Sequence, residues 1–537
     1  MKNKFNYFII LISTFLLFSF GCSEEFLEEK ALTFYTEDNF YTTPEAMDLG
    51  VVHFYSDAMN NLGTNISFLL ASDLGRVPMY SANVGGGYTN VVNGSYSGGI
   101  WVNYYQAINR INTLMSHIDG IKWKSEEQKN RIKGNALFFR TMYYLRLAIG
   151  YGEIPIVTEP VTSAKTDFIR NSRAEVVAQL IKDAKEASEI LPQFGTRKGE
   201  IGRGAAQHLL THVYLYAKQW DKAEQTATSL ITSGDYRLMT ERFGVNKDKP
   251  GTAYSDLFLD GNVNRYEGNY ESLYVWQAAD MYQTKGAGMH PKMSALCKYQ
   301  NVPGFTLSME YWQRGKGYFI LSPYVINELF DPKNPMDDRG SDFAIFRSWR
   351  FNDAAYIAAQ KAKGTPLTQV VDGKTVEVQV GDLAVITDAN RDNLWPVLVK
   401  WMDNFTTNLT ETMQDKCFAC SRLAETYLFR AEARFKQGNL QGAADDINTL
   451  RRRAHAPEVS ASDINMNFIL AESAKELIGE QWRQLELMRT GKIIEINELY
   501  NPNSRGYISA KDTLFPIPTS EIDRMKDSPY FPQNPGW

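Results

Sequence analysis

The chain has few of the residues that metal and redox sites require. Its 537 residues include only 6 histidines and 4 cysteines. The one closely spaced pair, Cys417 and Cys420, lacks the second pair that completes a zinc site, and no thioredoxin-like strand pattern precedes it. An oxidising compartment would let this pair form a disulfide, so its redox state stays open. We expect these two residues and Cys297 to be structural or incidental, and we predict no metal and no cofactor.

The histidines form no recognisable catalytic group. His208 and His212 share one helical face, but no glutamate stands beside them in the arrangement of a metalloprotease. Packing or surface exposure therefore explains them better than metal binding, and no histidine makes a recognisable triad with serine or cysteine. The 62 acidic residues are too many for a catalytic carboxylate pair to be chosen by counting. We predict that the protein is not an enzyme, with a glycoside hydrolase as an open alternative.

The chain also has no excess of positive charge. Lysine and arginine number 57 against 62 aspartates and glutamates, which gives a formal net charge of -5. Nucleic-acid binding calls for a basic face, so we expect no nucleic-acid partner. A composition of 44% hydrophobic and 22% charged residues is ordinary for a folded globular protein of one or two large domains.

A long apolar run occurs only at the N-terminus. Two lysines precede an apolar stretch over about residues 7–20, which is followed by Gly21 and Cys22. The stretch is shorter than the roughly 20 residues that span a bilayer, and it predicts a signal peptide over residues 1–21. Cys22 looks like the lipidated first residue of a mature lipoprotein, although the two residues before Gly21 depart from the common form of this motif. Attachment to a membrane would then come from acyl chains.

Most of the remaining chain reads as helices. Thr43 is a good capping residue, Pro44 suits the first helical turn, and Glu45 favours the positive end of the helix dipole. A second long helix is predicted over about residues 125–149, ending near Gly150.

Two helical hairpins repeat one pattern. Residues 204–217 and residues 422–437 each read as a helix that is followed by a short turn and a second helix. A small and a large residue are seven apart in both second helices: Ala223 and Leu230, and Ala443 and Leu450. Small residues let paired helices approach closely, and the pattern resembles tetratricopeptide repeats, which stack such hairpins into a superhelix.

The region from about residue 240 to 415 differs in composition. It is rich in Gly, Asn, Pro, Tyr and Trp and lacks long helical periodicity. Residues 370–376 surround the pair Asp372-Gly373 and predict a short β-hairpin. We expect an irregular, loop-rich region on a rigid helical scaffold, which is where binding residues tend to lie.

Aromatic and amide side chains gather around the glycines at positions 85–87. They are Tyr80, Asn83, Tyr88, Asn90, Asn93, Tyr96 and Trp101. This mixture suits sugars, because the C–H faces of a pyranose pack on aromatic rings and its hydroxyls need donors and acceptors. An ordinary surface loop with a tyrosine-rich edge is the alternative. Trp101 also has helical spacing with Tyr105 and Ile108, so core packing is open for it.

A second aromatic cluster lies in the irregular region. Its members are Trp276, Tyr282, Tyr311 and Trp312. We prefer Trp312, which Gln313 and Arg314 follow, as the partner of the first loop. Burial in the core is the alternative for each of these rings, because large aromatics are more often buried than exposed.

Residues 476–489 are the most specific stretch of the chain. They read as helical, and Glu480 and Arg483 are spaced to form an ion pair that fixes helix packing. As a string, the stretch resembles the C-terminal signature of the SusD/RagB family of outer-membrane nutrient-binding lipoproteins. Further segments that resemble this family follow in its order: residues 36–41, 135–140, 151–155, 337–339, 422–433, 515–518 and 533–537.

The resemblance implies a mainly α-helical fold in which tetratricopeptide-like hairpins form a superhelical scaffold and an irregular region carries short β-hairpins. It implies a single domain over residues 22–537. Within it, an N-terminal part covers about residues 22–235, an irregular ligand-side region about 240–415, and a C-terminal repeat part about 416–537.

The resemblance also implies a lipid-anchored glycan-binding protein of the cell surface, which delivers oligosaccharides to a SusC-like TonB-dependent outer-membrane transporter. Residues 23–25, Ser-Glu-Glu, resemble the acidic signal for surface export, with a plain solvated stretch as the alternative. The ligand contacts that we expect are Asp73, Arg76, Tyr88, Tyr96, Trp101 and Trp312. A peptide-capturing subunit, as in the RagB branch, a lipid-anchored glycoside hydrolase and a purely structural repeat scaffold stay open.

Overall fold

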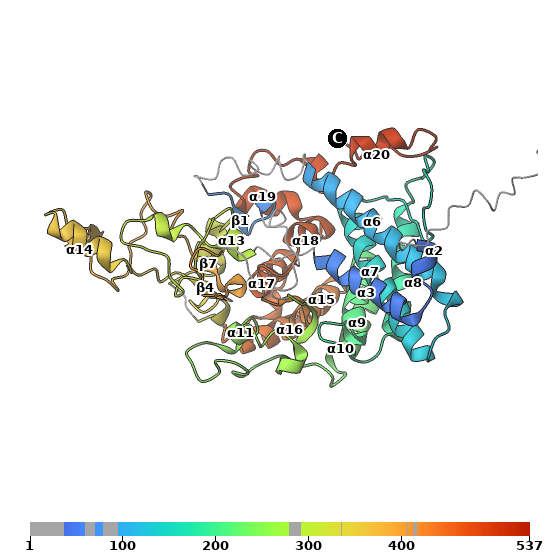
Figure 1. Cartoon of the computed structure of the whole chain (residues 1–537), viewed down its shortest axis with the longest axis horizontal. Coiled ribbons are helices and arrows are strands. Elements are labelled where there is room, and N and C mark those ends of the chain that lie inside the picture. The colour runs from blue at the N-terminus through green and yellow to red at the C-terminus, as the bar shows by residue number, and fades with distance from the viewer. Residues whose placement is uncertain are drawn as a thin grey trace, which may run out of the picture.

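The computed structural model describes residues 37–59, 70–78, 95–278, 291–333, 336–404, 406–411 and 416–537. Helices dominate this part of the chain (Figure 1), as predicted. In chain order they are α2 (Glu37–Phe40), α3 (Pro44–Ala58), α6 (Ser95–His117), α7 (Glu126–Tyr151), α8 (Arg173–Ile190), α9 (Arg203–Tyr216), α10 (Trp220–Ile231), α11 (Ala253–Asp256), α13 (Pro291–Ala295), α14 (Ala354–Ala362), α15 (Leu423–Lys436), α16 (Leu440–Arg453), α17 (Met466–Leu477), α18 (Arg483–Arg489), α19 (Ile493–Tyr500) and α20 (Thr519–Arg524). Among the described residues, none of the helices has the length and apolarity to cross a bilayer.

The predicted helix starts are confirmed. The Thr43 side chain accepts a hydrogen bond from the backbone N–H of Ala46 at 3.2 Å, and Pro44 opens α3. Ser125 caps α7, and that helix ends at Tyr151. The chain leaves α7 through Gly152, whose φ of +77° is open to glycine at little cost.

The two predicted hairpins are also confirmed, and they belong to one stack. Helix α7 packs on α8, α8 on α9, and α9 on α10; α10 then packs on α15, which pairs with α16. The array therefore continues from Ile231 to Leu423 across the irregular region (Figure 1). Ala223 and Ala443 are both fully buried, as expected for positions where paired helices approach closely.

The strands of the described residues are short and lie in two-stranded antiparallel pairs. The pairs are β1 (Gly75–Arg76) with β3 (Ile320–Leu321), β2 (Ser272–Trp276) with β8 (Phe418–Arg422), β4 (Ile345–Phe346) with β7 (Val397–Leu398), and β5 (Thr368–Val371) with β6 (Lys374–Glu377). The last pair is the predicted hairpin. Asp372 and Gly373 form its turn with φ of 48° and 76°, the left-handed values that a two-residue type I′ turn requires.

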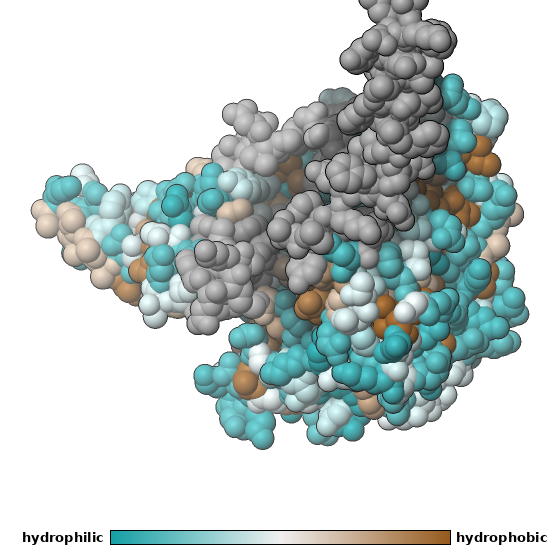
Figure 2. Space-filling view, turned by 45° about the vertical axis from the view of Figure 1, so that its right-hand side comes forward, coloured by the Kyte–Doolittle hydropathy of each residue, from teal (hydrophilic) through white to brown (hydrophobic). Residues whose placement is uncertain are grey.

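Helix α14 marks the tip of an arm that projects from the body of the molecule (Figure 1). Of its residues only Ile357 is buried. The nearby segment exposes large apolar side chains: Val370, Val371, Val376, Val380, Leu383 and Ile386. Elsewhere on the face drawn in Figure 2, the described surface is mostly hydrophilic, with hydrophobic residues in separate small patches.

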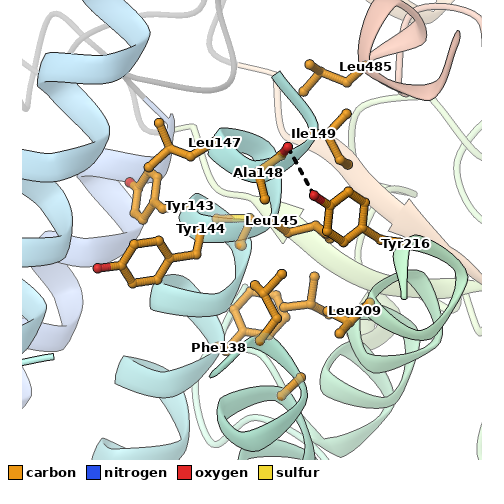
Figure 3. Packing of buried hydrophobic residues seen from close by; sticks show 14 of the residues in the cluster. Phe138, Tyr143, Tyr144, Leu145, Leu147, Ala148, Ile149, Leu209, Tyr216 and Leu485 are labelled. Atoms are coloured by element: carbon orange, nitrogen blue, oxygen red, sulfur yellow. Dashed lines mark hydrogen bonds between the residues drawn. The ribbon is translucent and has the colours of Figure 1, made fainter. Parts of the chain in front are cut away.

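Two hydrophobic clusters form most of the core. The larger lies among the helices, where Phe138, Leu145 and Leu209 pack between α7 and α9 (Figure 3). The Tyr216 hydroxyl donates to the carbonyl of Ala148 at 3.1 Å, so this buried polar group is satisfied. The second cluster lies in the irregular region and includes the fully buried Trp349. Burial of each large apolar side chain contributes about 1.5–3 kcal/mol to folding.

The signature stretch is not one continuous helix. Helix α17 ends at Leu477 and α18 begins at Arg483, so the prediction of a helix through residues 476–489 is wrong in between. Gly479 has a φ of +81°, and a Cβ there would lie 2.5 Å from a methyl carbon of Leu398. The backbone turn at this glycine is what separates the two helices.

The expected ion pair between Glu480 and Arg483 is also wrong, although both charges are structural. The Glu480 carboxylate accepts hydrogen bonds from Arg422 Nε at 2.6 Å and from Lys400 Nζ at 2.5 Å. Arg483 instead pairs with Asp73. The turn at Gly479 carries the two signature residues toward different partners.

A buried ionic network joins the irregular region to the repeats. The Glu476 carboxylate contacts Arg339 at 3.4 Å, Arg422 at 3.2 Å and Arg453, with all four side chains fully buried. Burial opposes ionisation of Glu476, but the three guanidinium groups outweigh it and hold the pKa of Glu476 well below its ordinary value. Arg339 comes from the irregular region, while Arg453 ends α16.

The two repeat histidines have packing roles, as predicted. Both rings stack on Phe429, with centroids 5.1 Å away for His208 and 4.7 Å away for His212. His208 contacts Glu425 at 3.1 Å and His212 contacts Glu486 at 2.6 Å. In the part of the chain that the structure describes, no group of three or more His, Cys, Asp or Glu side chains is placed to hold a metal ion.

The three described cysteines are free thiols: Cys297, Cys417 and Cys420. Burial raises the pKa of the Cys417 thiol and, more strongly, that of the Cys420 thiol, which disfavours the reactive thiolate.

Candidate functional site

Trp312 stands on a strained backbone turn. Trp312 and Gln313 both have left-handed φ angles, 55° and 70°, which few residues other than glycine adopt. Each such residue costs about 1–3 kcal/mol and persists only where its surroundings hold it. Two in succession indicate a turn that is kept for the position of its side chains.

The Gln313 side chain holds this turn in place. Its amide nitrogen donates to the carbonyls of Thr406 at 2.7 Å and Asn408 at 2.9 Å, and its oxygen accepts from Lys292 Nζ at 2.9 Å. Gln313 and Lys292 are both fully buried, and Lys292 also lies 3.4 Å from the carboxylate of Asp403. Buried hydrogen bonds and one ion pair therefore fix the turn against residues 403–408.

Aromatic rings support Trp312, and the ring in direct contact with it, Phe346, is partly buried. The Trp312 ring meets Phe346 edge to face, with centroids 5.4 Å apart, and Phe346 meets Trp349 in the same way at 5.0 Å. Tyr311 is buried and its hydroxyl donates to the carbonyl of Arg350 at 2.8 Å. Trp312 itself is partly exposed, so part of its side chain is accessible to a ligand.

Polar side chains surround the same turn. Arg314 and Asn404 are exposed, and the Asn404 amide donates to the carbonyl of Met309 at 2.7 Å. Asn408 is exposed as well. Ring, amide and guanidinium groups together can bind a ligand by stacking and hydrogen bonding, and such binding needs no covalent bond.

Asp73 lies in the core rather than on a surface. Its two carboxylate oxygens accept hydrogen bonds from Arg483, and the residue is fully buried. The structure therefore gives Asp73 a structural role in place of the ligand contact expected from the sequence. Sequence patterns did not reveal this, because the partner is far away along the chain.

Arg76 is likewise committed inside the protein. It donates to Asp392 at 2.7 Å, and its guanidinium carbon lies 4.8 Å from the centre of the Trp395 ring. The residue is only 9% exposed, so a direct ligand contact from Arg76 is not supported. Trp395 is partly buried and is a ring that sequence reasoning missed; its place in the Trp-rich irregular region was the available signal.

Trp101 and Trp312 pack in different hydrophobic clusters. It belongs to the helical core cluster and is 4% exposed, whereas Trp312 packs on the second cluster. Trp101 lines a cavity of about 480 Å³ between α6, residues 155–161 and the C-terminal segment. The cavity walls are largely apolar and include Tyr105 and Phe531. Core packing, the alternative that helical spacing left open, accounts for Trp101.

Most of the remaining candidate residues have no described side chain. Tyr88 and Cys22 lie outside the described residues, and so does Tyr282. Tyr96 lies in the first turn of α6, but its side chain is not described. Trp276 is 5% exposed in β2 and stacks on Phe418 at 5.6 Å, which is a core position. Trp312 is thus the one predicted contact whose described side chain is available to a ligand.

Two family profiles match this chain. One, described as the SusD family, matches residues 363–537. The other, described as starch-binding and associating with the outer membrane, matches residues 25–215. The first match overlaps the end of the irregular region and includes the hairpin of α15 and α16. The second match ends within α9, before α10 begins.

Individual proteins match over most of the chain. A SusD-like protein of Formosa agariphila is 21% identical and covers 96% of both chains. The starch-binding protein SusD of Bacteroides thetaiotaomicron is 24% identical over 82% of this chain and 78% of its own length. A solved laminarin-binding SusD-like protein has a TM-score of 0.66 at 21% identity and covers 93% of this chain and all of its own. At this identity the structural match demonstrates the shared fold.

Proposed function

Because this chain belongs to the SusD/RagB family, we propose that it is a glycan-binding protein of the outer cell surface, which captures oligosaccharides and delivers them to a SusC-like TonB-dependent transporter. The observation that carries the proposal is Trp312, which is partly exposed on a strained turn and packs on the aromatic ring of Phe346. The matched starch-binding and laminarin-binding proteins support a carbohydrate as the ligand.

Binding would rest on stacking and hydrogen bonds. The apolar face of a pyranose ring packs on the open face of Trp312, and its hydroxyls accept from Arg314 or exchange hydrogen bonds with Asn404. An aromatic contact of this kind contributes about 0.5–1.5 kcal/mol beyond the area it buries, so a single site binds weakly. Enclosure between this protein and a transporter would raise the affinity by placing the ligand at high local concentration. No covalent step is needed.

The same proposal places the lipid anchor on Cys22, after removal of residues 1–21. A Cys22→Ser chain should be exported but not lipidated, and it should move from the membrane fraction to the soluble fraction. Surface labelling of the wild-type chain on intact cells tests the outward orientation. Equal membrane retention of the Cys22→Ser chain would contradict an anchor at this residue.

The projecting arm supports a protein partner. Its exposed apolar side chains on β5, β6 and the following segment are of the kind that mark contact surfaces. Replacing Val370, Val376 and Val380 by serine should reduce co-purification with a TonB-dependent transporter from detergent-treated outer membranes. Glycan binding by the same variant should be unchanged, because these three valines are exposed and lie outside the cluster on which Trp312 packs.

Affinity electrophoresis of residues 23–537 through gels that contain plant, fungal and host polysaccharides tests the ligand class. We expect retardation by at least one polymer, no released sugar, and loss of retardation in Trp312→Ala. Trp220→Ala is the matched control, because Trp220 is also partly buried but opens helix α10 of the repeats. Its retardation should equal that of the wild type.

The other outcomes separate the alternatives. Sugar release in the gel would indicate a glycoside hydrolase. If no glycan retards the protein and the same preparation binds peptides, the protein is a peptide-capturing subunit. A melting temperature of Trp312→Ala close to that of the wild type would show that a loss of retardation reports on binding rather than on folding.

A further inference from the structure

A second pocket lies apart from Trp312. It has a volume of about 340 Å³ and opens between the loop that joins α8 to α9 and the segment that leads into β2. Aromatic rings form much of its wall: Phe194, Tyr236, Tyr266 and Tyr270. The buried cluster behind it, which includes Tyr236 and Leu273, shares no residue with the cluster under Trp312.

Arg265 lies at the centre of these rings. Its guanidinium carbon is 4.2 Å from the ring centre of Phe194, 4.9 Å from that of Tyr236 and 5.2 Å from that of Tyr270. Its Nη1 is shielded from solvent and has no hydrogen-bond partner. Among the described residues, no carboxylate forms an ion pair with Arg265, whereas nearby Arg197 pairs with Asp48 at 2.7 Å.

An arginine in such a setting lacks an acceptor. Shielded polar groups in proteins are nearly always hydrogen-bonded, and guanidinium groups match the planar oxygens of carboxylate and sulfate. Arg265 as a whole is partly exposed, and the rings beside its guanidinium strengthen a charge interaction there by lowering the local polarity. The missing acceptor is therefore best supplied by an anionic group on a ligand.

The charge of the pocket favours the same ligand. Glu200 is the one carboxylate among its lining residues, and Arg131 and Arg197 already pair with it. Hydrogen bonds from Thr196 and the charge of Arg131 outweigh burial and keep the pKa of Glu200 below its ordinary value, so this carboxylate stays ionised and paired. Lys198 and Arg237 add positive charge at the rim, where each cation lies over a tyrosine ring.

Two of the rings keep much of their surface exposed, although Lys198 lies over Tyr266 and Arg237 lies over Tyr270. Tyr266 is 49% exposed and Tyr270 is 37% exposed, whereas buried tyrosines elsewhere are closed to ligands. The volume lies at the small end of ligand sites, which range over about 300–1,000 Å³. The pocket therefore suits a short piece of a chain rather than a long polymer segment.

We propose that the Arg265 pocket is a second carbohydrate site, which takes a sugar unit that carries a carboxylate or sulfate group. Arg265 holds the anionic group, and the exposed parts of Tyr266 and Tyr270 contact the sugar unit that carries it. The inference rests on the proposed glycan-binding function and extends it from neutral faces at Trp312 to charged units at a separate pocket. Uronic acids and sulfated sugars share this chemistry, and the test separates them.

The test measures the affinity of residues 23–537 for oligogalacturonides, for the same oligosaccharides after carboxyl reduction, and for sulfated and plain dextran oligosaccharides, by isothermal titration calorimetry in 0.15 M salt. We expect Arg265→Met to weaken binding of at least one anionic ligand by about tenfold or more, the loss expected for a charge-assisted hydrogen bond. Binding of the neutral counterparts should not change.

Arg173→Met is the matched control. Arg173 lies 4.2 Å from the ring centre of Tyr216, so this variant removes the same charge and the same type of ring contact at another place. Its affinities should equal those of the wild type, which excludes a general effect of net charge. A selective loss with galacturonides identifies a carboxylate site, and a selective loss with sulfated dextran identifies a sulfate site.

Two results would overturn the inference. The first is equal binding of anionic and neutral ligands by the wild type, and the second is equal anionic binding by wild type and Arg265→Met. Neither result contradicts the proposed function, provided that neutral glycans still bind the wild type and that Trp312→Ala still abolishes this binding. Absence of all glycan binding would remove the function and the second site together.

Discussion

Arg483 and Asp73 form a two-pronged buried ion pair across 410 residues of sequence, with Nε–Oδ1 and Nη2–Oδ2 distances of 2.9 and 2.8 Å. A third donor of Arg483, Nη1, reaches the carbonyl of Leu470 at 2.7 Å. The pair joins the segment before β1, which pairs with β3 of the irregular region, to helix α18 of the C-terminal repeats. One residue of the family signature thus connects three parts of the chain.

Removal of one partner should strongly destabilise the protein. In Asp73→Ala, the Arg483 charge stays buried without its carboxylate, and we expect the free energy of unfolding to fall by about 3–5 kcal/mol. Urea denaturation followed by tryptophan fluorescence measures this. The control is Glu45→Ala, which breaks an exposed pair with Lys124 and should leave the midpoint nearly unchanged. A loss below about 1 kcal/mol in Asp73→Ala would contradict the role of this pair.

The ionic network predicts acid sensitivity. The pKa of Glu476 is depressed in the folded state, because three guanidinium groups outweigh its burial. Its contribution to stability is therefore complete above the ordinary glutamate pKa of about 4.3 and is lost as the pH falls below that value. The pKa of Glu486 is depressed in the same sense, since Arg489 and His212 outweigh its burial.

Urea midpoints at pH 7, 5, 4 and 3 measure this loss. We expect little change from pH 7 to 5 and a steep fall from pH 4 to 3, with a shallower fall in Glu486→Gln. If Glu476→Gln folds, the pH dependence of its urea midpoint gives a second measure of the loss. A wild-type midpoint that stays constant down to pH 3 would show that the fold lowers the pKa of neither carboxylate.

Two buried lysines predict that stability also rises with pH in mild alkali. Burial lowers the pKa of Lys400 to about 8, despite the opposing charge of Glu480, and burial lowers the pKa of Lys416 to about 8 as well. The unfolded chain binds more protons than the folded chain between pH 8 and the ordinary lysine pKa of about 10.4, so these groups make stability rise with pH there.

Tyrosines reverse that trend above pH 10. Burial raises the pKa of Tyr236 to about 12, so the folded chain keeps a proton that the unfolded chain loses, and stability falls. We expect maximal stability between about pH 8 and 10, measured by urea denaturation at half-unit steps. Lys400→Met should flatten the rise below pH 10. A maximum at pH 6 to 7 in both chains would contradict the lowered lysine pKa.

Local sequence signals were sufficient for several local features of this protein. The cap at Thr43 and the turn at Asp372 each depend on neighbours within a few residues, and both were predicted correctly. Partners of buried charges were not predictable in this way. The three-residue spacing of Glu480 and Arg483 suggested a pair, but the partners that the fold supplies lie far away in sequence.

The same limit applies to the candidate site. An aspartate and an arginine near an aromatic loop have the chemistry of ligand contacts, and only long-range packing decides that Asp73 and Arg76 are buried instead. Trp312 was chosen for its neighbours, but its strained backbone is visible only in three dimensions. Arg265 escaped notice because its aromatic surroundings come from separate loops.

Alanine substitutions at two glycines distinguish the cost of backbone strain from the cost of steric crowding. Gly479 has a φ of +81°, and an added Cβ would lie 2.5 Å from Leu398 and 2.9 Å from Trp401. Gly491 has a similar φ of +72°, but nothing lies within 4 Å of its added Cβ. Gly491→Ala should therefore cost only the backbone term of about 1–2 kcal/mol, whereas Gly479→Ala adds overpacking of about 1–3 kcal/mol. Equal unfolding free energies of the two variants would show that the core around Leu398 yields freely.

Gln313 provides the sharpest test of how the turn positions Trp312. Gln313→Ala keeps the left-handed backbone of a residue with a Cβ and removes the amide that binds the carbonyls of Thr406 and Asn408. Gln313→Gly removes the same amide but relieves the backbone strain, so it should be more stable than Gln313→Ala by about 1 kcal/mol.

Both Gln313 variants should bind the retarding glycan more weakly than the wild type, because Trp312 loses the anchor that fixes its orientation, and a loosened ring recovers less stacking energy. Affinity electrophoresis at several glycan concentrations measures the change, and denaturation curves measure the stability difference in parallel. Weaker binding in both variants, whatever their stabilities, assigns the amide a positioning role. Wild-type affinity in Gln313→Gly would mean that backbone geometry alone presents Trp312 and that the buried amide serves only the fold.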